Sequence, residues 1–287
     1  MTVVVGISPT HRTTDGIALA SMLARSSDTD LLLVAVVPAP WQGKNAHLDA
    51  GYRQDLRLRA EQSLAEVGQT IPTDVVFMTQ VRESVSISEG LSEAATESNA
   101  PMLVLGSSTM GLLGRVALGS VTERLLHSSP VAVAVSPRGF SAAAGQQVSR
   151  VSIAYAVGPD ESSLIATAGQ VGGEIGAGVQ LVSFAARPAA PVTSGVGLRA
   201  EDDVLDQWAL DVTATTDELN RQVSAAAGDC AVEPAVIGRG ESWSRALEAI
   251  DWTPGEVLVI GSRALPTPPE CSSVARPPRS PAIAPFP

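Results

Sequence analysis

Two glycine–serine pairs have the types and spacing expected of a phosphate site. Gly106 and Ser107 follow an apolar run, and Gly119 and Ser120 open a helical pattern. A helix start offers unpaired N–H groups and a partial positive charge, which suit a phosphate. Glycine lets the main chain approach a ligand closely, and serine adds a hydroxyl. Turn glycines with an ordinary serine helix cap would give the same pattern, so both interpretations stay open at this point.

The elements that would position these residues alternate as strands and helices through the first half of the chain. Apolar runs predict buried parallel strands, and amphipathic stretches between them predict crossover helices. The predicted strands are residues 2–8, 30–37, 74–81, 100–108 and 130–137, and the predicted helices are residues 15–25, 52–68, 86–98 and 119–129. Both glycine–serine pairs therefore fall at the carboxyl end of a parallel sheet, where open α/β sheets bind ligands.

The same order restarts after a stretch of small and polar residues at 138–149, which we interpret as a linker. The predicted strands of the second half are residues 151–157, 178–186, 230–238 and 255–263, and the predicted helices are residues 161–177, 203–228 and 242–250. This second copy stops after its fourth strand. The chain is therefore predicted to be an internal repeat of one α/β domain.

Composition excludes several classes of function. The 287 residues carry a formal net charge of −11, which disfavours nucleic acid and anionic membranes as partners. No apolar stretch is long enough to span a bilayer, and the start lacks a secretory pattern, so we expect a cytoplasmic protein. Cys230 and Cys271 lie far apart and predict free thiols, and the three histidines do not predict a metal site.

The site region resembles the universal stress protein family. The family motif is Gly-x-x-Gly, nine residues and Gly-Ser or Gly-Thr, followed by a helix and a fifth strand. Here Gly106 and Thr109 are followed by nine residues, Gly119-Ser120 and "PVAVAV", and "GRGESWSRALEAIDWTPGEVLVIGSR" is similar to the second half of tandem members. The resemblance implies two tandem Rossmann-like (HUP-type) parallel-sheet domains with helices on both faces.

The resemblance also implies a nucleotide site in the first domain. In the family, the motif holds the phosphates of ATP, with Mg²⁺ as a possible companion. The corresponding residues here are Gly106, Gly119 and Ser120, with Ser107 and Val121 adjoining through their main chains. The second copy has no matching Gly-Ser helix start, so it is not expected to bind nucleotide.

Three further positions bear on this site. The second glycine of the motif is replaced by Thr109, whose β-branched side chain disfavours positive φ and narrows the loop. A family aspartate near the adenosine falls on Ser8, which is shorter and uncharged. The adenine-side position at the end of the second strand falls on Val36. The replacements at Thr109 and Ser8 are expected to weaken ATP binding.

The C-terminal tail, residues 266–287, departs from the repeat and is rich in proline and serine. Codons for "PECSSVA", read one frame over, permit Arg-Val-Phe-Leu-Gly-Ser, and the first copy has "RVALGS" at the corresponding place. Nine shifted codons later, Pro-Val is permitted, as in the first copy. We therefore interpret the tail as an out-of-frame or disordered segment, with the shift near Leu265.

These observations predict domains at 1–137 and 150–265, the second incomplete. Without a fifth strand in the second copy, the strand at Val131–Val135 would be an unpaired edge that forms a homodimer. The expected function is binding of ATP or another adenine nucleotide in a bacterial stress response. The alternatives are a nucleotide-free interaction protein and a slow ATP hydrolase, although no nucleophile–base pair is visible and no enzyme activity is expected.

Overall fold

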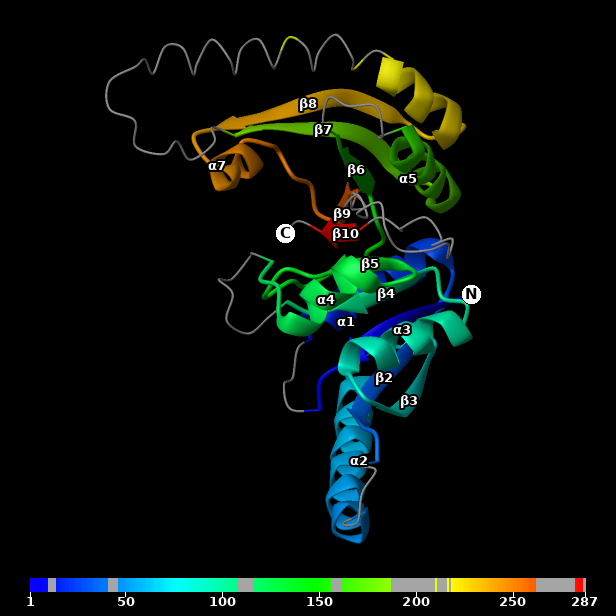
Figure 1. Ribbon diagram of the computed structural model, residues 1–287. Coiled ribbons are helices and arrows are strands. Elements are labelled where there is room, and N and C mark those ends of the chain that lie inside the picture. Colours follow the sequence, from blue (N-terminus) through cyan, green and yellow to red (C-terminus); the bar gives the residue numbers. More distant parts are fainter. Residues whose placement is uncertain are drawn as a thin grey trace, which may run out of the picture. The chain divides into compact units, whose positions relative to one another are not determined.

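The computed structural model describes residues 1–9, 14–40, 46–107, 116–155, 162–186, 210, 216, 218–261 and 282–285 (Figure 1). They divide into two compact units. Unit 1 contains Met1–Gln147 and the strand near the C-terminus, and unit 2 contains Val148–Gly261. Each unit is a parallel-sheet α/β fold, as the sequence predicts. Residues 138–147, predicted as part of a linker, belong to unit 1.

Unit 1 is built on a parallel sheet with the order β3-β2-β1-β4-β5-β10. The strands are β1 (Thr2–Ile7), β2 (Asp30–Pro38), β3 (Phe77–Ser84), β4 (Met102–Leu105), β5 (Ala132–Val135) and β10 (Ala282–Pro285). From β1 the chain builds outward in one direction to β2 and β3, and then in the other to β4 and β5. The topological switch point, where open α/β sheets place their ligands, therefore lies between the carboxyl ends of β1 and β4.

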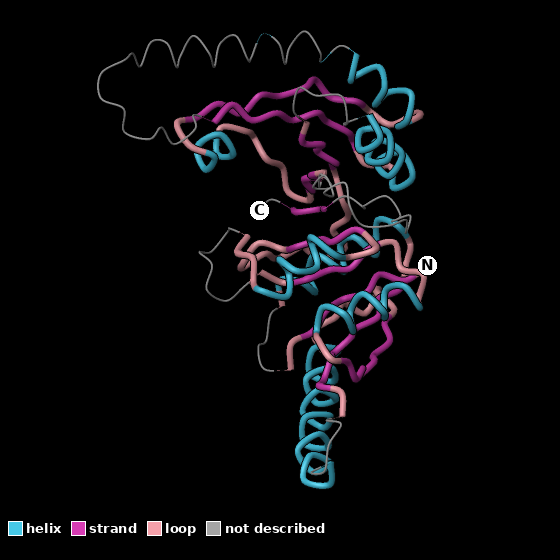
Figure 2. The backbone as a smooth tube through the Cα atoms, viewed as in Figure 1, coloured by secondary structure: helices cyan, strands magenta, loops and turns pink. Residues whose placement is uncertain are grey.

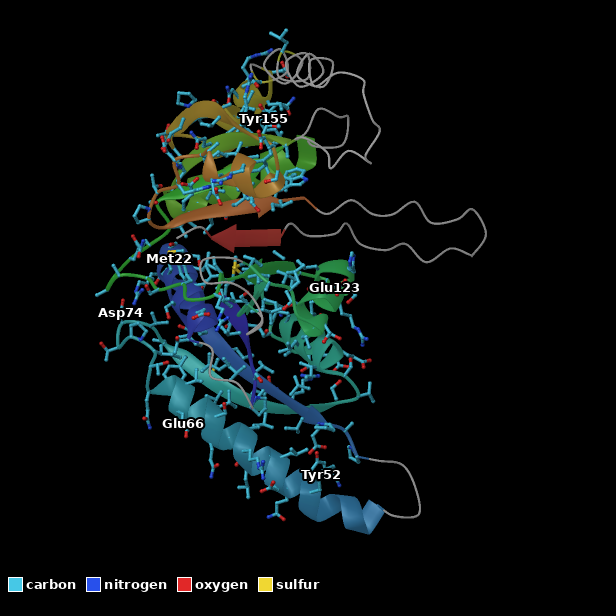
Figure 3. All side chains as sticks on the ribbon, turned by 90° about the vertical axis from the view of Figure 1, so that its left-hand side faces the viewer. Met22, Tyr52, Glu66, Asp74, Glu123 and Tyr155 are labelled. Atoms are coloured by element: carbon cyan, nitrogen blue, oxygen red, sulfur yellow. The ribbon has the colours of Figure 1, made fainter. Side chains whose placement is uncertain are left out.

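Four helices accompany this sheet, drawn in cyan in Figure 2. They are α1 (Asp15–Ser27), α2 (Ala46–Gly68), α3 (Ile87–Glu97) and α4 (Ser120–Ser128). Residues of α3 and α4, such as Leu91 and Leu125, share a core with Val4, Val34 and Leu103 of the strands. On α2, Tyr52 is 61% exposed (Figure 3).

Several element boundaries in unit 1 differ from the sequence prediction, among them the starts of α2 and β3. Helix α2 begins six residues earlier than predicted, at Ala46. Strand β3 begins at Phe77 and not at residue 74, because the main-chain nitrogen of Val75 bonds to the carbonyl of Pro72 in a turn at 3.1 Å. Val75 and Val76 therefore precede the strand, although both are apolar. Hydrophobic periodicity alone does not distinguish such a turn from a strand.

Unit 2 repeats the first four strands of unit 1. Its elements are β6 (Arg150–Ala154), α5 (Ser162–Ile175), β7 (Gly178–Ala186), a helical segment at 218–227, β8 (Val232–Gly240), α7 (Trp243–Glu248) and β9 (Glu256–Ile260). The parallel order β9-β6-β7-β8 corresponds strand by strand to β4-β1-β2-β3. The predicted internal repeat is confirmed.

The glycines of α5 serve close packing between helices. A Cβ atom on Gly173 would lie 2.7 Å from the carbonyl oxygen of Ala227, and one on Gly169 would lie 3.1 Å from Cβ of Ala226. Both alanines lie in the helical segment 218–227. Glycines that lower the helix propensity of α5 thus allow the two helices to touch.

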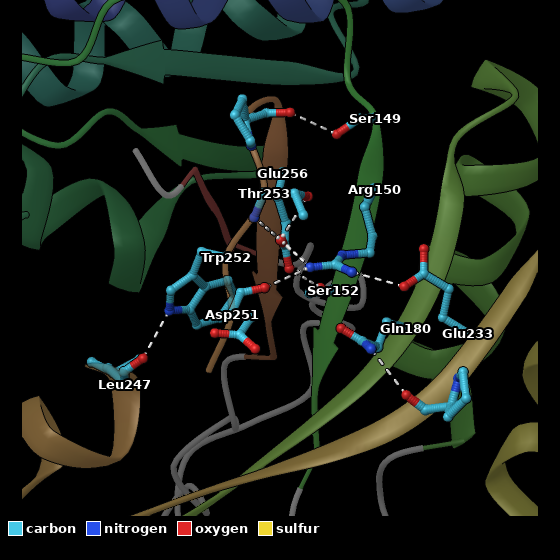
Figure 4. A network of polar contacts seen from close by, with 12 residues as sticks. Ser149, Arg150, Ser152, Gln180, Glu233, Leu247, Asp251, Trp252, Thr253 and Glu256 are labelled. Atoms are coloured by element: carbon cyan, nitrogen blue, oxygen red, sulfur yellow. Dashed lines mark hydrogen bonds and ion pairs between the residues drawn. The ribbon is translucent and has the colours of Figure 1, made fainter. Parts of the chain in front are cut away.

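A buried polar network joins β6 to β9 at the amino ends of these strands (Figure 4). Glu256 is fully buried, and its carboxylate accepts bonds from Arg150 Nη2 at 2.6 Å and from Ser152 Oγ at 2.5 Å. The Thr253 nitrogen also donates to it, at 2.8 Å. Arg150 in turn donates to Glu233 of β8 at 2.7 Å. The buried acid is therefore both charge-paired and hydrogen-bonded, as a buried charge requires.

The C-terminal strand corrects two predictions about the tail. Residues 282–285 form β10, which pairs in parallel with β5 through Ala282–Val133 and Ile283–Ala134. The expectation of a wholly unstructured tail is wrong for these residues, and so is that of an unpaired β5 edge on which the predicted homodimer rested. The reading-frame shift stays a prediction, which resequencing the gene around the Leu265 codon would test.

Candidate functional site

The carboxyl end of β4 meets the first turn of α1 at the switch point of unit 1. A Cβ atom on Gly16 would lie 3.0 Å from the main-chain nitrogen of Gly106 and 3.4 Å from the carbonyl carbon of Leu105. A Cβ atom here would require the end of β4 or α1 to shift by a few tenths of an ångström, so glycine suits this close approach. Gly16 therefore takes part in setting the position of Gly106, the first residue of the motif.

Ser107 joins the two ends of the loop that leads to α4. Its hydroxyl accepts a bond from the main-chain nitrogen of Ala117 at 2.7 Å and donates to the carbonyl of the same residue at 3.3 Å. The side chain of Ser107 is buried, with 4% exposure. This double contact brings the end of β4 beside the residues that precede α4. Thr109 lies outside the described residues.

The start of α4 has main-chain donors and no side-chain cap. Gly119 is the N-cap residue, with extended φ and ψ of −87° and 167°, and it makes no side-chain capping bond. Ser120 is the first helical residue, so the interpretation of Ser120 as an ordinary serine cap is wrong. An uncapped first turn directs N–H groups outward, the arrangement that anions use. Val121, the next residue, packs against the hydrophobic core.

The remaining predicted positions, Ser8 and Val36, contribute differently. Ser8 directly follows β1, and its carbonyl accepts a bond from the Ser63 hydroxyl of α2 at 3.4 Å. The side chain of Val36 is 7% exposed and belongs to the core shared with α3. Any contact of Val36 with a ligand would therefore come from its main chain. That these residues bind a nucleotide stays a prediction.

Sequence reasoning did not select Asp15 and Gly16, the first two residues of α1. Asp15 Oδ2 accepts a bond at 3.0 Å from the main-chain nitrogen of Gly139, four residues after the end of β5. The available signal was a glycine near the start of a helical pattern, where a better helix former is expected. A glycine at such a place often marks a close approach of two backbones.

Other candidates from the sequence have structural roles in the described residues. Ser86 is the N-cap of α3, and its hydroxyl accepts a bond from the Glu89 nitrogen at 3.2 Å. Cys230 is a free thiol, as predicted. The indole of Trp252 donates to the carbonyl of Leu247 at 2.8 Å, whereas Trp243 is 65% exposed and its ring centroid lies 6.1 Å from that of Phe184.

The described part of the chain offers neither a metal site nor a membrane-spanning helix. There, no three His, Cys, Asp or Glu side chains group together in a way that would hold a metal ion. No described helix has the length and apolar character needed to cross a membrane. His127 lies in the last turn of α4, and His11 lies outside the described residues.

Comparisons with known proteins agree with the motif. The profile of the universal stress protein family matches residues 1–137. A universal stress protein of Mycobacterium tuberculosis strain H37Rv is 30% identical over 266 residues, covering 91% of this chain and 89% of its own. A solved universal stress protein from Archaeoglobus fulgidus is 15% identical and covers 83% of this chain and 78% of its own, with a TM-score of 0.46. The chain belongs to the universal stress protein family.

Proposed function

We propose that unit 1 binds an adenine nucleotide, ATP in the first place, as part of a bacterial stress response. The observation that carries the proposal is the double contact between Ser107 and Ala117. It holds the end of β4 next to an uncapped helix start at Gly119. This is the junction at which open α/β sheets bind phosphate groups.

The phosphates would be held by main-chain groups. The first-turn nitrogens of α4, beginning with Ser120, would donate to a terminal phosphate, and the Ser120 hydroxyl would add one more donor. Gly106 would let the phosphate chain approach the end of β4, because it has no side chain in the way. Such main-chain contacts depend on the charge and shape of the phosphates, so they can bind a triphosphate without a dedicated lysine or arginine.

The residues at Ser8 and Thr109 lower the expected affinity. Ser8 offers a hydroxyl where a family aspartate would hold the ribose, so one charged hydrogen bond is missing. Mg²⁺ would arrive with the phosphates of ATP, because the described residues hold no acidic group of three that would bind it alone. We therefore expect binding in the micromolar range or weaker, and exchange with the solvent nucleotide pool.

The test is to identify nucleotide in the supernatant of purified, heat-denatured protein and then to titrate the protein with ATP, ADP, GTP and AMP. The proposal predicts heat from ATP and ADP and much less from GTP, with one site per chain. Equal heats for ATP and GTP would argue for a phosphate site without adenine recognition. No heat from any nucleotide would favour the nucleotide-free interaction protein.

A further inference from the structure

Residues 138–147, which we call the strap, are fastened along α1. At the start of the helix, Asp15 accepts the bond from the Gly139 nitrogen at 3.0 Å. At its end, Gln147 Nε2 donates to the carbonyl of Arg25 at 3.0 Å, and Arg25 Nη1 donates to the carbonyl of Gln146 at 3.4 Å. A stretch of small and polar residues that suggests a flexible linker is thus tied down at both ends of one helix.

Further contacts within unit 1 hold the strap in place. Phe140 of the strap is 8% exposed, so the segment also buries an aromatic side chain. Arg25 is held in turn by Asp74, through bonds of 2.6 Å and 3.0 Å from Nε and Nη2. The strap therefore has a defined seat within unit 1, and the chain enters unit 2 one residue after it ends.

Three segments meet in pairs at the carboxyl end of β4. The main-chain nitrogen of Ser136, just before the strap, donates to the carbonyl of Leu105 at 3.0 Å. Asp15 binds Gly139, and its neighbour Gly16 approaches Gly106 so closely that a Cβ atom would lie 3.0 Å from the Gly106 nitrogen. The end of β4 is thus contacted by Ser136, two residues before the strap, and by Gly16, whose neighbour Asp15 holds the strap.

We propose that Asp15 and Gly16 couple the seating of the strap to the geometry of the nucleotide site. Asp15 and Gly16 are adjacent in the first turn of α1, and they contact the strap and Gly106 respectively. Release of the strap from Asp15 therefore loosens the contact between Gly16 and Gly106. Close-packed contacts of this kind transmit displacement because they cannot deform smoothly. By linkage, a nucleotide held at Gly106 then tightens the strap by the same factor as a seated strap tightens nucleotide binding.

The proposal deepens the nucleotide function, but its first test needs no nucleotide. Hydrogen exchange is followed in peptides covering residues 102–107 and 138–147 of the full chain, with Asp15→Ala and Asp15→Asn. Asn keeps an oxygen that accepts the Gly139 bond, whereas Ala does not. We expect Asp15→Ala to speed exchange in both peptides by about fivefold or more, the lower end of usual couplings, and Asp15→Asn to stay near the unaltered protein.

Faster exchange in the strap alone, with residues 102–107 unchanged, would overturn the coupling and leave the nucleotide function untouched. Equal effects of Ala and Asn would overturn the role of the hydrogen bond. A peptide from α3, residues 87–97, serves as a reference that should not respond, and a response there as large as in the strap would mean general loosening and would also contradict the proposal.

The second test uses Gly16→Ala beside Gly51→Ala. Both place a methyl group on a helical glycine, but Gly51 has nothing within 4 Å of the new atom. If ATP binds to the unaltered protein, Gly16→Ala should weaken it about tenfold and speed exchange in the strap, while Gly51→Ala changes neither. Unchanged affinity and strap exchange in Gly16→Ala would refute the contact. If ATP does not bind to the unaltered protein, the proposed nucleotide function is wrong. The hydrogen-exchange measurements still test whether the strap is coupled to the end of β4.

Discussion

The hydroxyl of Ser107 accepts a hydrogen bond of 2.7 Å from the main-chain nitrogen of Ala117, ten residues further along the chain. Ser107 follows β4, and Ala117 precedes the helix start at Gly119. One buried side chain thus fixes the distance between the two halves of the predicted phosphate site. Because the contact uses a side chain, a point substitution can remove it.

Replacing Ser107 with alanine should leave the half-buried main-chain nitrogen of Ala117 without this partner and release the loop. We expect a loss of about 1–3 kcal/mol in the free energy of unfolding, measured by urea titration, and weaker ATP binding. Ser107→Thr keeps the hydroxyl and serves as the matched variant. If Ser107→Ala unfolds at the same urea concentration as the unaltered protein, the Ala117 contact carries no stability.

Removing Glu256 should destabilise unit 2 strongly, because Arg150 would keep a buried charge with one partner fewer. A loss of about 3–5 kcal/mol is expected for Glu256→Ala. The control is Glu248→Ala, which removes the exposed ion pair with Arg245 and should cost less than about 1 kcal/mol. Urea unfolding followed by tryptophan fluorescence reports unit 2 well, since Trp252 lies beside this network. Similar costs for the two variants would contradict the role assigned to Glu256.

Acid should weaken unit 1 through Asp74. The paired guanidinium of Arg25, chiefly by its hydrogen bonds, lowers the pKa of Asp74 below its ordinary value. A carboxylate with a lowered pKa stabilises the fold above its unfolded pKa of about 3.9 and loses that contribution as pH falls through the folded value.

Asp74→Asn should therefore flatten the fall of stability below about pH 4 and leave a smaller difference from the unaltered protein at low pH than at pH 7. The measurement is the urea midpoint between pH 6 and pH 3. A variant whose midpoints run parallel to those of the unaltered protein throughout would show that the Arg25 pair does not contribute to acid sensitivity.

Removal of the C-terminal strand should make the protein self-associate. A chain that ends at Gly261 lacks β10 and exposes one edge of β5, and an exposed edge recruits other strands. Light scattering after size exclusion should show a concentration-dependent increase in mass, which we do not expect for the full chain. Ile283→Pro, which disrupts ladder pairing, should act in the same direction, and Ile283→Val should not.

A substitution at Val133 within β5 is not a suitable test of the β5 edge. Val133 is 3% exposed and belongs to the core shared with α3 and α4, so Val133→Lys would break the core and not merely block the edge. Truncation and the Ile283 variants avoid that problem. A truncated chain that stays monomeric at high concentration would mean that β5 does not recruit a partner.

The sequence predicted most of the fold because local patterns carried it. Buried parallel strands give uninterrupted apolar runs, and β7 was placed at its observed bounds, Gly178–Ala186. The motif spacing located both the end of β4 and the start of α4. Where the prediction failed, long-range contacts decided. The pairing of β10 with β5 joins residues about 150 positions apart and leaves no mark in a Pro-rich composition.

In the candidate site, too, local patterns indicated some residues, and long-range contacts determined the others. Gly106 and Gly119 were selected through the resemblance to the family motif, whereas Asp15 and Gly16 were missed, because their contacts are with partners 90 or more residues away. The polar character of the strap suggested a free linker, but its seat depends on Arg25 and Gln147 meeting across the fold. Composition indicates how much apolar surface a segment can bury, but it does not show which distant residues will form hydrogen bonds with that segment.

The most direct test of nucleotide binding is calorimetric titration of ATP into the full chain, beside Gly119→Val and the control Gly51→Ala. A valine at the helix start would crowd the first-turn nitrogens of α4 and disfavour close approach of a phosphate. The account predicts saturable heat with one site per chain for the unaltered protein and Gly51→Ala, and at least about tenfold weaker binding for Gly119→Val. Equal binding by all three proteins would contradict the site, and no heat from any of them would contradict the function.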